Sequence, residues 1–272
     1  MLEKGPPVFL DYNQAELDAA YDQASYAPNR EQLIKRRIND SELARLRVGE
    51  PERVAYGSAE IERLDIYRTE RDAAPVFVFI HGGAWRGGRS KDFATPAEMF
   101  LAAGAHYVVP DFACVQDVGG SLRVLADQVC RAIASVYENA AHVGSDPNQL
   151  YVGGQSSGGH LAAVALTTDW PRDFGLPVDI IKGGMCISGM YNLTPVRPLR
   201  IAGDAGQSIR SPGAGRARPD GLESGAVAND PHRSAFGAVT GLRRDAPGSS
   251  RSPGPGELRG NGSRSREQQR AD

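Results

Sequence analysis

Helical and strand patterns of apolar residues alternate along the first 200 residues of the chain. Residues 13–26 and 31–47 carry spaced apolar positions among many polar ones and predict two polar, amphipathic helices. Residues 61–68 alternate apolar and polar side chains, which is typical of a half-buried strand. Residues 75–80 (PVFVFI) are a continuous apolar run, which predicts a parallel strand buried on both faces.

The alternation continues as far as residue 187. The remaining predicted strands span residues 106–112, 149–153 and 180–187, and the remaining predicted helices span residues 96–103, 121–138 and 157–168. The first of these helices has Thr95 as its predicted cap and Pro96 at its first position. Strands and helices in this order imply βαβ units, so we expect an α/β fold with a mostly parallel, doubly wound sheet.

The composition changes sharply near residue 200. From residue 201 to 272, Gly, Arg, Ser and Pro make up 39 of 72 residues, whereas Lys, Tyr, Trp, Met and Cys do not occur. Such a segment buries too little apolar surface to offset its ordering entropy, so residues 199–272 are predicted to be disordered. The predicted organisation is a helical segment at 1–60 packed on a core at 61–198, followed by this tail.

One hypothesis explains the tail as a shifted reading frame of a GC-rich gene. The sheet would then be incomplete at its C-terminal end and would keep an exposed parallel edge. Sequencing the parent gene around the codon for Arg197 tests this hypothesis, and an uninterrupted frame shared by relatives would contradict it.

Net charge, cysteine content and hydropathy argue against several kinds of binding site and partner. The net charge of −2 and the pI of about 6.2 argue against a nucleic acid or an anionic membrane as partner. Cys114, Cys130 and Cys186 are odd in number and lack CxxC spacing, which argues against a disulfide framework and a zinc site. No stretch approaches the roughly 18 apolar residues of a membrane span. We therefore expect a soluble, cytoplasmic protein without a metal or an organic cofactor.

A candidate nucleophile follows the predicted strand at 149–153. Residues 154–158 (GQSSG) fit the pattern G-x-S-x-G, which forms a nucleophile elbow between a strand and a helix. The strained turn holds the hydroxyl of Ser156 clear of its neighbours, and the helix N-terminus presents free N–H groups to an oxyanion. Taken alone, the motif is also compatible with a glycine-rich turn that binds a phosphate.

A second motif, HGGAW at residues 81–85, directly follows the buried strand at 75–80. A loop in this place supplies glycine N–H groups to an oxyanion hole, because glycine has no Cβ to block the substrate carbonyl. Residues 83–90 also approach a P-loop, but Arg89 stands where lysine is required and Trp85 would fill the cradle. The two motifs lie about 70 residues apart in the expected order, and together they predict a serine-nucleophile α/β-hydrolase.

With these motifs the sequence resembles the arylformamidase (kynurenine formamidase) branch of the α/β-hydrolases over residues 11–197. The similarity rests on HGGAWRGG, VVPDF, GQSSGGHLAA and SGMYNLTPV, and on YNQAELDAAYDQ and YGSAEIERLDIYR nearer the N-terminus. The resemblance implies an N-formyl aryl amide such as N-formylkynurenine as substrate, cleaved through an acyl-serine that releases formate. A carboxylesterase or carbamate hydrolase of the same fold is the alternative, and a homodimer is left open.

The resemblance also implies roles for individual residues. Ser156 corresponds to the nucleophile of this branch. The N–H groups of Gly82, Gly83 and Ser157 correspond to the oxyanion hole. Trp85 corresponds to a residue that lines the pocket for an aromatic amide or ester.

A catalytic triad also needs an acid and then a histidine after the serine. In the family these residues lie near T-P-E-F-like and H-F-E-like runs, and neither run occurs here. His160 is one helical turn beyond the serine and is expected to be structural, which leaves His232 as the candidate base and Asp204 or Asp220 as the candidate acid. Asp111 precedes the serine and is expected to fix the loop beside the pocket. A hydrolase fold without activity, which lacks acid and base, is the non-enzymatic alternative.

Overall fold

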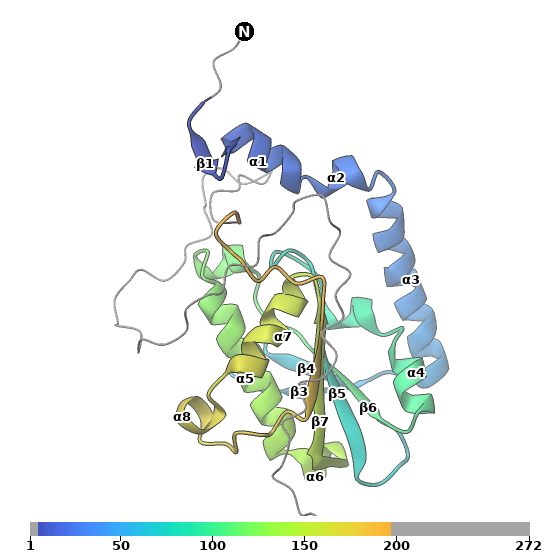
Figure 1. The fold of residues 1–272 in the computed structure, drawn as a ribbon. Coiled ribbons are helices and arrows are strands. Elements are labelled where there is room, and N and C mark those ends of the chain that lie inside the picture. Colours follow the sequence, from blue (N-terminus) through green and yellow to red (C-terminus); the bar gives the residue numbers. More distant parts are fainter. Residues whose placement is uncertain (1–4, 197–272) are drawn as a thin grey trace, which may run out of the picture. The chain divides into compact units, whose positions relative to one another are not determined.

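The central element of the fold is a sheet that lies between two layers of helices (Figure 1). Its six strands are in the order β3-β4-β6-β5-β7-β8. The computed structural model describes residues 5–196, so the predicted disordered tail lies outside the described residues. The strands are β3 (Glu52–Ala55), β4 (Arg63–Tyr67), β5 (Ala74–Ile80), β6 (His106–Pro110), β7 (Ser145–Gln155) and β8 (Gly183–Ile187). The pairs from β6 to β8 are parallel, whereas β3–β4 and β4–β6 are antiparallel. This mostly parallel sheet confirms the predicted α/β class.

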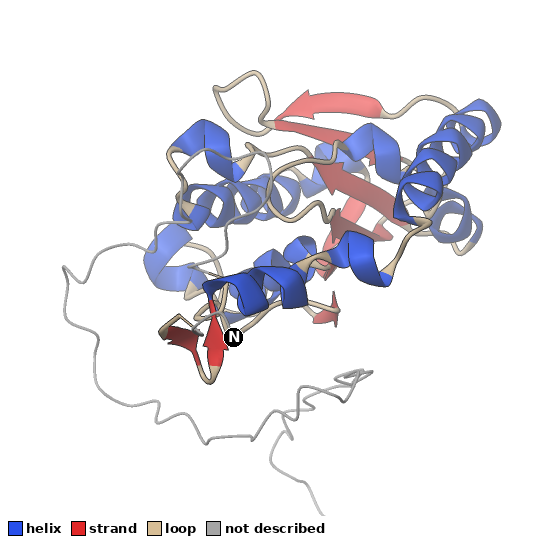
Figure 2. Cartoon of the chain, turned by 90° about the horizontal axis from the view of Figure 1, so that it is seen from above, coloured by secondary structure: helices blue, strands red, loops and turns tan. Residues whose placement is uncertain are grey.

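Helices cover both faces of the sheet (Figure 2). One face carries α5 (Leu122–Glu138) and α7 (Ser157–Thr167), and the other carries α3 (Arg30–Val48), α4 (Ala97–Ala102) and the 3₁₀ helix η1 (Ser90–Phe93). The shorter elements are β1 (Pro7–Phe9), β2 (Tyr12–Asn13), α1 (Gln14–Tyr21), α2 (Gln23–Tyr26), η2 (Val115–Val118), α6 (Ala140–Val143) and α8 (Trp170–Phe174). No helix among residues 5–196 combines the length and the apolar character needed to cross a bilayer.

Strand β5 contributes to the hydrophobic cores on both faces of the sheet. Val76, Val78 and Ile80 belong to the larger cluster, which also contains the buried stripe of α5. Phe77 and Phe79 point the other way and pack on the smaller cluster around η1 and α4. The two-sided burial explains why the sequence of this strand is a continuous apolar run rather than an alternating one.

Several elements differ from the sequence prediction. The helix predicted at 13–26 is interrupted at Asp22, whose side chain accepts a hydrogen bond from the N–H of Ala24 and begins a new helix. Thr95 does not cap α4, because the helix begins at Ala97 and Pro96 is at the cap position rather than at the first helical position. The hydroxyl of Thr95 instead lies 3.3 Å from that of Ser41 on α3. Strand β3 lies within the segment that was predicted to be helical, and its short ERVA sequence has no distinctive pattern.

The first turn of α7 lies against the end of β5 with no room for a side chain. A Cβ on Gly158 would overlap the carbonyl oxygen of Ile80 and approach that of His81. Both obstacles are backbone atoms, so the clash cannot be relieved by moving a side chain. This contact fixes where α7 begins and therefore where the preceding turn lies.

We predict that Gly158→Ala lowers the free energy of unfolding by about 2 kcal/mol, as expected for overpacking. In the interior of an ordinary helix the same change would be stabilising by about 0.5–1 kcal/mol. The sign of the change in the free energy of unfolding therefore distinguishes the close contact described here from an ordinary helix. Chemical denaturation measures the effect. Gly87→Ala is the control, since a Cβ there meets no atom within 4 Å, and its change should stay within about 0.5 kcal/mol. Equal stability of the two variants would contradict the packing described for α7.

Candidate active site

Ser156 lies in a strained turn between β7 and α7. Its backbone has φ 56° and ψ −123°, in a region that side chains other than glycine rarely adopt. The N–H of Ser156 donates to the carbonyl of Ile187 on β8 at 2.7 Å, and its own carbonyl accepts from the N–H of His160 at 3.1 Å. Strain of this kind persists only where the surrounding structure holds it, and it is the conformation that a nucleophile elbow requires.

The loop after β5 packs its backbone directly against this turn. A Cβ on Gly82 would lie 2.8 Å from the carbonyl oxygen of Gln155 and 3.3 Å from the Cβ of Ser156. Within residues 5–196 the N–H groups of Gly82 and Gly83 have no hydrogen-bond acceptor. The N–H of Ser157 is in the first turn of α7, where no intrahelical acceptor exists. The structure thus places Gly82 against the turn of Ser156, whereas an oxyanion hole formed by the N–H groups of Gly82, Gly83 and Ser157 stays a prediction.

The imidazole of His81 holds the start of this loop. The ring is 2% exposed and stacks between Phe93 and Phe112, at centroid distances of 5.3 Å and 4.4 Å. Its Nδ1 lies 3.0 Å from the carbonyl oxygen of Gly82. Burial lowers the pKa of His81, so the ring is neutral at pH 7. The guanidinium of Arg37 on α3, 4.2 Å from the centre of the Phe93 ring, extends the stack to the helical layer.

Trp85 and His160 pack against each other beside the elbow. Their rings form a T-shaped contact with centroids 5.5 Å apart. Trp85 is 3% exposed and belongs to the larger core cluster, and its role in lining a substrate pocket stays a prediction. Burial lowers the pKa of His160. The buried Trp85 Nε1 and His160 Nδ1 have no partner among the described residues, an arrangement that costs free energy unless water or a ligand supplies one.

The described residues do not assign a catalytic base. None of the four histidine side chains within residues 5–196 hydrogen-bonds to the hydroxyl of Ser156. The candidate base His232 and the candidate acids Asp204 and Asp220 lie outside the described residues. In the same range no group of His, Cys, Asp and Glu has the arrangement of a metal site.

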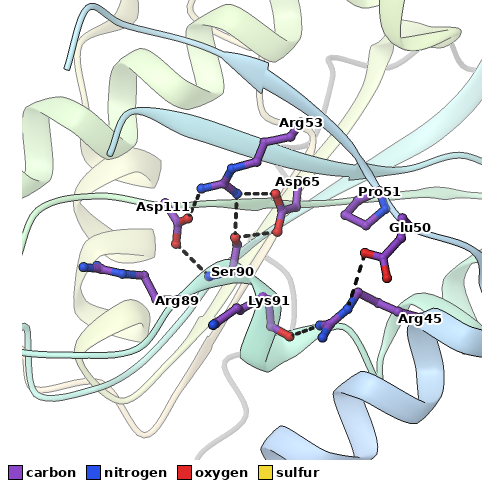
Figure 3. A pocket seen from close by; sticks show the side chains of 9 residues that line it. All are labelled: Arg45, Glu50, Pro51, Arg53, Asp65, Arg89, Ser90, Lys91 and Asp111. Atoms are coloured by element: carbon purple, nitrogen blue, oxygen red, sulfur yellow. Dashed lines mark hydrogen bonds and ion pairs between the residues drawn. The ribbon is translucent and has the colours of Figure 1, made fainter. Parts of the chain in front are cut away.

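A polar pocket of about 550 Å³ lies at the far end of the loop after β5 (Figure 3). Its lining residues are Arg45, Glu50, Pro51, Arg53, Asp65, Arg89, Ser90, Lys91 and Asp111. Ser156, Gly82 and Trp85 do not line it. Sequence reasoning placed Asp111 beside a loop but missed Arg53 and Asp65, because their proximity depends on a strand register that no local signal encodes.

Comparison with known proteins defines the class of fold. Residues 64–179 match the BD-FAE family model. The fold is similar to the crystal structure of a candidate thioesterase from Silicibacter sp. TM1040, with a TM-score of 0.53, 24% sequence identity and coverage of 66% of each chain. Together with the strained serine between β7 and α7, these similarities define the fold as that of an α/β-hydrolase.

Two curated relatives narrow the comparison further. The chain is 30% identical over 194 residues to a kynurenine formamidase of Salmo salar, which covers 68% of this chain and 63% of the relative. It is 33% identical over 150 residues to an isoprenylcysteine alpha-carbonyl methylesterase of Arabidopsis thaliana, covering 52% and 34% respectively. The chain therefore spans less than two thirds of the length of either relative. The resemblance to kynurenine formamidases that the motifs indicated is confirmed.

We predict that the free energy of unfolding falls between pH 7 and pH 5, in part through His81. An unfolded histidine binds a proton near pH 6.5, whereas the lowered pKa of buried His81 prevents the folded state from binding one at this pH. The unfolded state is therefore stabilised relative to the folded state as the pH falls. Each such histidine contributes up to about 1.4 kcal/mol per pH unit. Thermal or chemical unfolding across this pH range measures the slope.

The variant His81→Phe keeps an aromatic ring in the stack but cannot bind a proton, so it should show a shallower slope. His142→Gln is the control, because the side chain of His142 is 58% exposed. An unchanged slope in His81→Phe would contradict the role assigned to burial.

Proposed function

We propose that this protein is a serine hydrolase of the arylformamidase type, which cleaves N-formyl aryl amides through an acyl-serine intermediate. The observation that carries the proposal is the strained conformation of Ser156 with the backbone of Gly82 packed against its turn. A connecting turn without a catalytic role has no need of such strain. The similarity to a kynurenine formamidase supports the choice of a formamide as substrate.

In the proposed reaction the Oγ of Ser156 attacks the formyl carbon while a general base takes its proton. The carbonyl oxygen becomes negatively charged and accepts hydrogen bonds from the N–H groups of Gly82, Gly83 and Ser157. Collapse of the intermediate breaks the C–N bond, and the departing aryl amine takes the proton from the base. Water then attacks the formyl-serine, which releases formate and restores the hydroxyl. The chemistry needs no metal and no organic cofactor.

His232 is the candidate base, with Asp204 or Asp220 as its acid, because this chain order matches Ser…Asp…His. The variant His232→Gln tests the assignment. If His232 is the base, its loss should cost about as much activity as the loss of Ser156, because the members of a triad act as a unit. Full activity in His232→Gln would remove it as a candidate.

A carboxylesterase is the second candidate function, favoured by the similarity to a methylesterase. The attack by serine and the oxyanion are the same for an ester as for a formamide. The difference lies in the leaving group, because an alcohol departs with less help from a proton donor than an amine does. Ester and formamide substrates must therefore be compared on the same enzyme.

We predict that the full chain hydrolyses N-formylkynurenine with a higher kcat/KM than p-nitrophenyl acetate. Ser156→Ala should lower kcat/KM for both substrates by at least about 10³-fold, because it removes the attacking group. Steady-state kinetics with both substrates measure this. The matched control is Ser121→Ala, since Ser121 precedes α5 and its side chain makes no capping hydrogen bond; its kinetics should match those of the wild type.

Other outcomes separate the alternatives. Turnover of the ester alone would favour the carboxylesterase. A folded wild-type protein no faster than Ser156→Ala on either substrate would instead identify a hydrolase fold without activity.

A further inference from the structure

The loop from Gly82 to Arg89, here called the oxyanion loop, has four residues with positive φ, two of which are strained. Ala84 and Trp85 have φ values of 54° and 60°, and Gly83 and Gly88 have φ values of 138° and 92°. Ala84 and Trp85 carry a Cβ and therefore strongly disfavour this conformation. Such a loop keeps its shape only if the surrounding structure holds it at several points.

The start and the middle of the oxyanion loop have clear anchors. The stacked ring of His81 holds its start. In the middle, the carbonyl of Trp85 accepts a hydrogen bond from the N–H of Val115 at 2.7 Å, and that of Arg86 accepts one from the side chain of Gln116 at 3.0 Å. Both donors belong to the segment that follows β6. The far end of the loop needs an anchor of its own.

Ser90 provides this anchor through both of its donor groups. Its N–H donates to Oδ1 of Asp111 at 2.7 Å, and its hydroxyl donates to Oδ2 of Asp65 at 2.5 Å. The guanidinium of Arg53 lies between the two carboxylates (Figure 3), with Nη2 2.6 Å from Oδ2 of Asp111 and Nη1 paired with Oδ1 of Asp65. Ser90 is 1% exposed, and the two aspartates are 3% and 2% exposed. We call these four residues the Ser90 network.

Every carboxylate oxygen in the Ser90 network has a hydrogen-bond partner. Two buried carboxylates so close together are costly unless they are paired and hydrogen-bonded. Here each of the four carboxylate oxygens accepts a bond from Arg53 or Ser90. The pairing of Arg53 with Asp65 across β3 and β4 places these side chains on one face of the sheet. The two bonds of Ser90 are buried, and the bonds of the half-exposed Arg53 satisfy the remaining carboxylate oxygens, so that together they fix one position of Ser90.

We propose that Ser90, Asp65, Asp111 and Arg53 are positioning residues for the oxyanion hole. They fix the far end of the oxyanion loop, so that the strained loop holds the N–H groups of Gly82 and Gly83 beside Ser156. This inference rests on the proposed function. The rate of the reaction then depends on Arg53, which lies on the edge strand β3, about 100 residues before the nucleophile in the sequence.

The test compares Ser90→Ala, Ser90→Thr and Asp111→Asn with a matched control in the full chain. The control is Glu62→Gln, because Glu62 is also a buried carboxylate (4% exposed) paired with an arginine, Arg131, but does not touch the oxyanion loop. For each variant we measure kcat and KM for p-nitrophenyl acetate, and hydrogen exchange of the peptide that contains residues 82–89.

We expect Ser90→Ala and Asp111→Asn to lower kcat about tenfold while KM changes less than twofold, because oxyanion contacts form only in the transition state. Amide exchange in residues 82–89 should be faster in both variants. Ser90→Thr keeps the hydroxyl and should recover most of the lost kcat. Glu62→Gln should keep the kcat and the loop exchange of the wild type, even where its thermal stability falls.

The inference is overturned if Ser90→Ala and Asp111→Asn leave kcat and loop exchange unchanged, or if Glu62→Gln lowers kcat equally. A wild-type protein that turns over neither N-formylkynurenine nor p-nitrophenyl acetate would contradict the proposed function. In that case loop exchange alone decides whether the network holds the oxyanion loop, and unchanged exchange would overturn the inference as well.

Discussion

The close backbone contact between the loop after β5 and the turn after β7 is the constraint on which the site depends. Strands β5 and β7 are parallel neighbours that remain paired up to Ile80 and Gly154, so both chain segments leave the sheet at the same edge. Gly82 lets the loop touch the turn of Ser156, and Gly158 lets α7 begin directly above the end of β5. The two motifs therefore meet in space, although they lie far apart in the sequence.

This contact brings strain with it, and the rest of the fold offsets that strain. Ser156, Ala84 and Trp85 all have positive φ, which each residue adopts at a cost of about 1–3 kcal/mol. The two-sided burial of β5 fixes the strand from which the loop starts. Strand β8 fixes the serine turn through the carbonyl of Ile187. The core thus maintains a local geometry that the chain would not adopt in isolation.

The sequence predicts the parts of this arrangement that have local signals. The apolar run of β5, the stripe of α5 and the G-x-S-x-G turn all have a period or a spacing that follows from their burial or backbone geometry. Strand β3 and the Ser90 network could not be predicted, because Arg53, Asp65 and Asp111 meet only through strand register and the path of a loop. The catalytic base and acid are a different case, because no motif or spacing in the sequence identifies them as clearly as G-x-S-x-G identifies Ser156.

The most direct test of Ser156 as an activated nucleophile is covalent labelling of the full chain with a fluorophosphonate, followed by peptide mass spectrometry. An unactivated serine does not react with this reagent at a useful rate. A labelled serine therefore shows that a general base and an oxyanion hole are in place beside it. We expect one adduct, on the peptide that contains Ser156, and no adduct in Ser156→Ala. A folded wild-type protein with no adduct, or with an adduct on another serine, would contradict the assignment of Ser156.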